Sequence, residues 1–230
     1  SLAESYASKE SYLYEYLYLN EINIKEPPTK TIYNIRDSFS DDGMIVNAVY
    51  SYGDSKTVEY KISSDDYTIN PSEPLIFGTT LVTVSYEHNG ITKTVSQSIT
   101  VVDNIKPTID SVTGNATEWT NQNITLTINA TDNESGIAGY SFDNGTTWQT
   151  TNTKTYTETT TGIIVQVKDN KENISTYGEI INIDKIDKTA PTMTISPNGA
   201  TISQSQNVTI TAEDSGGSGL NSNNSYQYQL

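Results

Sequence analysis

One stretch of this chain occurs twice, and it decides the fold. Residues 103–109 read D-N-I-K-P-T-I, and residues 187–193 read D-K-T-A-P-T-M. Each copy is followed by an alternating apolar run that ends in an acid, N-I-T-L-T-I-N-A-T-D at 123–132 and N-V-T-I-T-A-E-D at 207–214. A Ser-Gly pair follows each acid, and Pro107 and Pro191 are 84 positions apart. A recurrence of this length exceeds a solenoid or propeller repeat and fits a whole small β-sandwich domain.

The chain is therefore predicted to be all-β, built of tandem immunoglobulin-like β-sandwiches in an extended array. We expect residues 1–19 to be the tail of a preceding region or a linker. Residues 20–102 should form a first sandwich, 103–186 a second, and 187–230 a partial repeat. Within 1–19, tyrosines alternate with other residues at 12–18 as on a strand, but the leucine spacing also fits a helix, so both readings remain open.

Composition excludes several classes of function. The net charge of −15 disfavours nucleic acid as a partner, because binding phosphates requires clustered Lys and Arg. The chain contains no Cys, which removes disulfides, thiolate metal sites and Cys nucleophiles. It also contains no apolar run of the roughly 18 residues that a membrane span needs, so no membrane insertion is expected.

The first sandwich resembles the bacterial Ig-like domain of group 3. Three motifs carry the resemblance: P-x-K-x-x-Y-x-x-x-x-x-F, then G-x-x-V-x-A-x-Y, then G-x-T-x-V-x-V-x-Y-x-x-N-G-x-T. They match Pro28, Lys30, Tyr33 and Phe39; Gly43, Val46, Ala48 and Tyr50; and Gly78, Thr80, Val82, Val84, Tyr86, Asn89, Gly90 and Thr92. One departure is Tyr52, which stands where the family has an Asp in an S-D-G turn. The resemblance implies a surface-exposed, non-catalytic sandwich and names no ligand.

The later segments look like the Ig-like repeats of large bacterial surface proteins, with T-A-P-T openings and D-x-x-x-S-G turns. These resemblances imply a non-catalytic structural or adhesive fragment of a bacterial cell-surface or secreted protein, which acts as a spacer or display stalk. The location would be extracellular and the chain monomeric, with an unidentified host or cell-surface glycan or protein as partner. A phage virion decoration or tail-fibre segment is an alternative, because such segments use the same modules.

Residues 141–148 resemble the Asp box of sialidases, S-x-D-x-G-x-x-W, through Ser141, Asp143, Gly145 and Trp148. Asp143 can accept backbone N–H groups across a turn, so the pattern favours a stabilised hairpin over catalysis. His88, the only histidine, precedes the Asn89-Gly90 turn and has no nucleophile motif nearby, which favours a solvated position. We therefore predict that the chain is not an enzyme.

Acids near the two linkers suggest a metal site. Asp103, Asp184 and Asp187 lie just before the proline-opened domains, and Asp132 and Glu134 lie in a turn that could join them. The arrangement resembles the linkers of cadherins, and loops rich in Asp and Asn supply the oxygen ligands that Ca²⁺ prefers. We expect no cofactor, with calcium at a domain junction as the alternative to solvated turn acids; Lys106, Lys185 and Lys188 beside the acids oppose a cation.

Two tryptophans suggest a second kind of site. Trp119 and Trp148 could stack on sugar rings, which would make the chain a carbohydrate-binding accessory module of a surface enzyme. This alternative requires that the rings are not buried in the cores.

Overall fold

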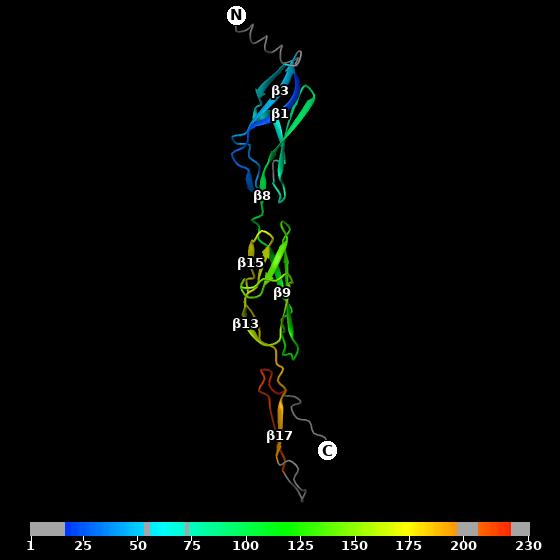
Figure 1. Ribbon diagram of the computed structural model, residues 1–230. Helices are drawn as coiled ribbons and strands as arrows, with labels where there is room; N and C mark the ends of the chain where they lie inside the picture. Colours follow the sequence, from blue (N-terminus) through cyan, green and yellow to red (C-terminus); the bar gives the residue numbers. More distant parts are fainter. Residues whose placement is uncertain (1–16, 53–55, 72–73, 197–206, 222–230) are drawn as a thin grey trace. The chain divides into compact units, whose positions relative to one another are not determined.

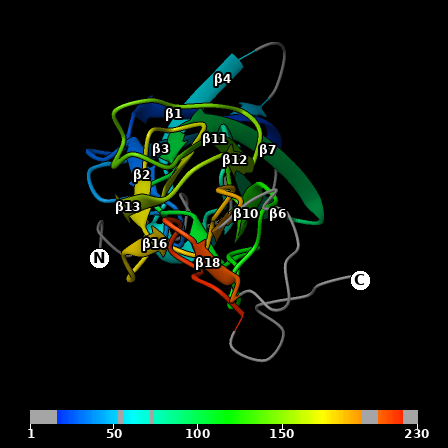
Figure 2. The same ribbon diagram turned by 90° about the horizontal axis from the view of Figure 1, so that it is seen from below.

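The computed structural model describes residues 17–52, 56–71, 74–196 and 207–221. The chain divides into two compact units, Ser1–Ile105 and Lys106–Leu230. The described residues form β-strands and one short 3₁₀ turn, η1 (Ser64–Asp66), with no α-helix among them, so the all-β prediction is confirmed. The open question of helix or strand concerns residues that lie mostly outside this range. Figures 1 and 2 trace the strands of each unit.

The first unit contains two three-stranded antiparallel sheets and one short parallel pair. One sheet has the order β1 (Tyr18–Glu26), β3 (Ile45–Tyr52), β4 (Lys56–Lys61), and the other has β5 (Tyr67–Asn70), β6 (Leu81–His88), β7 (Ile91–Ser98). The parallel pair joins β2 (Ile32–Asn34) to β8 (Thr100–Val102). β1 begins ahead of the boundary expected at residue 20, and both Leu17 and Leu19 are buried in the core.

Alternating side chains from the two sheets fill this core. Val46, Ala48 and Tyr50 point inward from β3, and Tyr67 and Val84 meet them from β5 and β6. Period-two alternation directs every second residue to the same face of a strand, so one face of each sheet is apolar and buried. The strand pattern expected from these residues is therefore present.

The Asn89-Gly90 turn between β6 and β7 adopts the predicted hairpin geometry. Asn89 has a φ of 51° and Gly90 a φ of 76°. Positive φ at both central residues defines the tight turn whose twist matches that of paired strands. His88 forms the last pair of this hairpin with Ile91, and its ring packs edge-on against Tyr50 at 5.1 Å between centroids. His88 is therefore partly exposed, and it lies at the end of a strand and not in the loop where it was expected.

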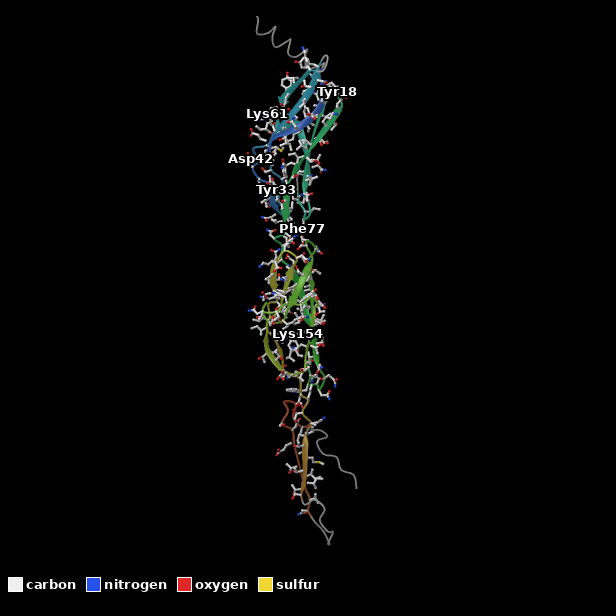
Figure 3. The ribbon with its side chains drawn as sticks, viewed as in Figure 1. Tyr18, Tyr33, Asp42, Lys61, Phe77 and Lys154 are labelled. Atoms are coloured by element: carbon white, nitrogen blue, oxygen red, sulfur yellow. The ribbon has the colours of Figure 1, made fainter. Side chains whose placement is uncertain are left out.

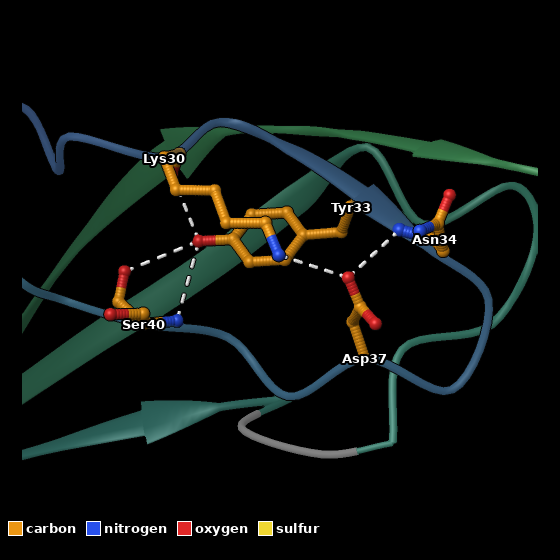
Figure 4. A network of polar contacts seen from close by, with 5 residues as sticks. All are labelled: Lys30, Tyr33, Asn34, Asp37 and Ser40. Atoms are coloured by element: carbon orange, nitrogen blue, oxygen red, sulfur yellow. Dashed lines mark hydrogen bonds and ion pairs between the residues drawn. The ribbon is translucent and has the colours of Figure 1, made fainter.

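A corner around Tyr33 explains the spacing of the first family-like motif (Figure 4). The Tyr33 side chain is 1% exposed, and its hydroxyl donates to the Lys30 carbonyl at 2.9 Å and accepts the Ser40 N–H at 3.3 Å. Lys30 Nζ lies 4.6 Å from the centre of the Tyr33 ring and pairs with Asp37 at 2.9 Å. Phe39 packs against Tyr33 at 5.7 Å between centroids. The three motif residues therefore belong to one folded corner.

Replacing Tyr33 by Phe should destabilise the first unit by about 1–3 kcal/mol, because the Ser40 N–H and the Lys30 carbonyl would lose a buried partner. Asp37→Asn is the matched control, since it removes the charge that pairs with Lys30 while its amide oxygen can still accept the Asn34 N–H, and it should cost less. Urea unfolding followed by circular dichroism measures both. Equal losses would show that the buried hydroxyl does not organise the corner.

The described residues of the second unit form four sheets. Two have three strands, in the orders β12 (Thr153–Tyr156), β10 (Ile124–Thr131), β9 (Thr108–Thr113) and β11 (Ile137–Ser141), β14 (Gln166–Asp169), β15 (Ile174–Thr176). The two others pair β13 (Thr160–Ile163) with β16 (Ile181–Ile183), and β17 (Thr192–Ser196) with β18 (Thr209–Glu213). The core contains Leu126 and Ile128 from β10, and Val165, Val167 and Ile183 on the facing side.

The repeated sequence forms a repeated hairpin. β9 pairs with β10 so that Ile109 lies opposite Ala130, and β17 pairs with β18 so that Met193 lies opposite Ala212. The sequence recurrence is therefore also a recurrence of cross-strand partners at this end of the strand pair, and beyond it a β-bulge before Ala130 shifts the register in the first copy only. The two copies differ in burial, because Ile128 of β10 is fully buried whereas its equivalent in β18, Ile210, is only partly buried.

Candidate functional site

The Asp-box residues build a hydrogen-bonded turn after β11. The Ser141 hydroxyl donates to Asp143 Oδ1 at 2.8 Å and accepts the Gly145 N–H at 2.8 Å. The Thr147 hydroxyl and backbone N–H both donate to the Asp143 carboxylate and hold its pKa at about 2. Each carboxylate oxygen is therefore used within the turn, which is a structural role.

Trp148 covers this turn. Its ring lies within 3.6 Å of the position that a Cβ at Gly145 would take, and Lys168 Nζ lies 5.1 Å from the ring centre. The side chain is only partly exposed. Trp148 therefore packs on its own hairpin and offers little free ring surface to a ligand.

Lowering the pH should reduce the stability that this turn gives to the fold, over a pH range that the pKa of Asp143 sets. The Asp143 pKa lies below the unfolded value of about 3.9, so the charged carboxylate stabilises the fold above about pH 4 and this stability is lost as the pH falls toward 2. Asp143→Asn should therefore flatten the fall in urea midpoint between about pH 5 and about pH 2, which unfolding followed by Trp148 fluorescence measures. Asp184→Asn removes the same charge from an exposed position. If that control flattens the profile equally, the turn is not the cause.

Asp132 shapes the turn between β10 and β11. Its Oδ1 accepts the N–H groups of Ser135 at 3.0 Å and Gly136 at 2.7 Å. Its Oδ2 and the Ser135 hydroxyl are buried atoms that have no hydrogen-bond partner among the described residues. Buried polar atoms are nearly always paired, so two adjacent exceptions leave room for a further ligand.

Asp169, at the end of β14, is an acid that the sequence interpretation did not assign. It is fully buried, its Oδ1 accepts the N–H groups of Lys171 and Asn173, and its Oδ2 accepts the Asn173 amide. Asp132 and Asp169 offer carboxylate oxygens within 4.8 Å of each other. The K-D-N-K-E-N stretch at 168–173 contains Asp169, and its sequence indicates a turn. The sequence does not show that this turn lies next to Asp132, so it gave no reason to assign Asp169 to a metal site.

Asp103, Glu134 and Asp184 were also predicted to bind a metal. Asp103, in the first unit, is buried, and its Oδ1 accepts the Ile105 N–H at 2.9 Å. Glu134 is partly buried in the turn that contains Asp132, and Asp184 is exposed. Their joint participation in a calcium site remains a prediction.

Asp187 holds the turn that follows β18, at residues 214–219, which we call the turn of the third repeat, counting the sandwich at 20–102 as the first. Its Oδ1 accepts the Thr189 N–H at 2.9 Å, and its Oδ2 accepts the N–H of Ser218 at 2.9 Å as well as the Ser218 hydroxyl. The Ser218 hydrogen bonds lower the pKa of this carboxyl below its usual value. A Cβ at Gly216 would collide with the carboxylate, so this position requires glycine. Asp187 therefore acts as a clamp between two segments of the second unit.

Trp119 lies beside this clamp. Thr120 donates its N–H to the Lys185 carbonyl and accepts the Asp187 N–H, both at 2.9 Å, so the backbone after Trp119 is held against the linker. The side chain is 40% exposed. It lines a hollow of about 420 Å³, which we call the Trp119 hollow. Its lining consists of Trp119, Thr157, Glu158, Thr159, Ile186, Asp187, Lys188, Thr189, Gly216 and Gly217.

The first unit has a polar hollow of about 390 Å³ near Asp41 and Asp42, which Figure 3 places by its Asp42 and Lys61 labels. Asp41 accepts the Tyr67 hydroxyl at 2.7 Å. Burial, and then Asp41, raise the pKa of Tyr67. The acid thus has a structural partner that fixes the loop.

Comparisons with protein-family models, with curated proteins and with solved structures found no match. No helix within the described residues has the length and apolar character needed to cross a bilayer.

Proposed function

We propose that this chain is a non-catalytic structural part of a bacterial cell-surface or secreted protein, in which tandem Ig-like β-sandwiches form a spacer or display stalk. The observation that carries the proposal is the hairpin that recurs with the same Ile109–Ala130 and Met193–Ala212 partners. A recurring hairpin supports repetition of one domain type along the chain.

The cores support the same proposal. The first unit buries its own apolar side chains, and the second unit buries a separate set. Domains with their own cores need few contacts with their neighbours, so they can be strung together to gain length. The net charge of −15 would keep such a chain soluble on an exposed surface.

An array of this kind should be extended in solution. A compact globule of this length has a radius of gyration of ~17 Å, and a linear array should give on the order of 25–30 Å by the same scaling. Small-angle X-ray scattering measures the value. A result near the compact figure would refute the array while leaving the strand assignments intact.

We further propose that Asp132 and Asp169 bind a divalent cation in the second unit, with calcium the expected ion. Two carboxylates with oxygens within 4.8 Å repel each other when both are charged, and Asp169 is excluded from solvent. A cation would offset this repulsion. It would also give partners to Asp132 Oδ2 and to the Ser135 hydroxyl, which have none among the described residues.

Calcium should therefore raise the melting temperature of the chain, since a ligand that binds only the folded state stabilises it by mass action. Asp132→Asn should abolish the rise, because it removes the unpaired oxygen while Oδ1 can still hold the turn. Asp187→Asn is the matched control and should keep the rise, since both Asp187 oxygens are hydrogen-bonded within the protein. Differential scanning calorimetry with and without calcium measures the effect. No rise in the unaltered chain, or an equal rise in Asp132→Asn, would remove this site.

A further inference from the structure

The Trp119 hollow contains an aromatic ring that the fold holds in place but does not cover. Trp119 is 40% exposed, although large aromatic side chains usually bury most of their area. Trp148, the other tryptophan, is packed on its own hairpin. A spacer function does not require an exposed tryptophan, so the exposure of Trp119 points to a further role.

Two contacts fix the ring. A Cβ at Gly217 would lie 2.4 Å from the ring carbon Cη2, so the glycine backbone packs directly on the outer edge of the indole. Lys185 Nζ lies 5.0 Å from the ring centre, and Lys185 is not among the residues that line the hollow. The glycine backbone and the lysine thus hold the ring in place, and the exposed part of the ring lines the hollow, where it is preorganised for stacking.

The position of Gly217 depends on the Asp187 clamp. Ser218 donates its N–H and its hydroxyl to Asp187 Oδ2, which holds the adjacent glycines against Trp119. The floor is the buried Ile186, which belongs to the core of the second unit. The hollow is thus built from the core, the linker and the turn of the third repeat, all within one unit.

The lining of the hollow carries three threonine hydroxyls, the two carboxylates of Glu158 and Asp187, and one lysine, Lys188, so its formal charge is negative. Thr157, Thr159 and Thr189 are exposed and supply hydroxyls that can donate or accept. Glu158 is an exposed acceptor opposite a lysine, Lys188, whose Nζ donates to Asn123 Oδ1 at 2.6 Å. An anionic ligand is therefore disfavoured, and a neutral ligand rich in hydroxyl groups matches the exposed threonines and Glu158.

We propose that the Trp119 hollow binds a neutral pyranose unit of a glycan. The apolar C–H face of such a sugar stacks on the indole, and its hydroxyls hydrogen-bond to Glu158 and to the threonines on the rim. The volume of about 420 Å³ lies within the range of small-molecule sites and suits one or two sugar rings. This ligand goes beyond the spacer function, which needs no ligand at all.

Tryptophan fluorescence tests the proposal directly. In a Trp148→Phe background, Trp119 is the only fluorescent indole, and methyl glycosides of glucose, galactose, mannose and N-acetylglucosamine are titrated to about 50 mM, followed by a glycan microarray to extend the panel. We expect a saturable change for at least one sugar. Glu158→Gln should weaken that sugar at least about tenfold, because it removes a charge-assisted hydrogen bond at an exposed position where folding is not at risk.

Lys154→Met is the matched control, since Lys154 lies over Phe142 and Tyr156 and does not line the hollow, and it should leave the affinity unchanged. The absence of any saturable response from the four glycosides and the array would overturn the proposal. So would a response that Glu158→Gln leaves unaltered, or a preference for a proline-rich peptide offered as competitor. Scattering on the same samples reports the extended array separately, so loss of sugar binding and loss of the spacer function can be distinguished.

Discussion

Burial of alternate side chains between small facing sheets is the constraint on which the rest of the structure depends. Hydrophobic residues make up only 34% of the chain, so each core must be filled by residues placed at every second position. Val46, Ala48 and Tyr50 do this in the first unit, and Leu126 and Ile128 in the second. The outward positions are then free to be Thr, Ser and Asn, which accounts for the polar composition.

Carboxylates fix the conformation of loops that make few contacts with these small cores. Asp143, Asp169 and Asp187 each accept several N–H or O–H groups from residues close by, and Asp187 also reaches a turn 31 residues further along the chain. An ionised carboxylate accepts several hydrogen bonds strongly, so one acid can replace much of the packing that a loop lacks. Part of the large negative charge is therefore structural as well as solubilising.

Local rules predicted much of this structure. The Asn89-Gly90 turn, the alternating strands and the Asp143 turn could all be read from the sequence, because each depends on residues within a few positions. Contacts between residues that are far apart in the sequence could not be predicted. The pairing of Asp132 with Asp169 and the packing of Gly217 on Trp119 require knowledge of which loops meet, and no local pattern encodes that. The contact between His88 and Tyr50 could not be predicted for the same reason, since Tyr50 lies on a different sheet.

The Trp119 hollow is specific to one place in the chain, although the surrounding hairpin is repeated. The turn of the third repeat reads D-S-G-G-S-G at 214–219, whereas the corresponding turn of the second repeat reads D-N-E-S-G at 132–136. Gly216 and Gly217 are the residues whose Cβ positions would collide with Asp187 and Trp119. Asn133 and Glu134 carry the side chains that this packing excludes, so the second repeat could not form the same contact. The repeated strand pair thus supplies the scaffold. Gly216 and Gly217 let one of its turns pack against Asp187 and the edge of Trp119, while part of the indole stays exposed.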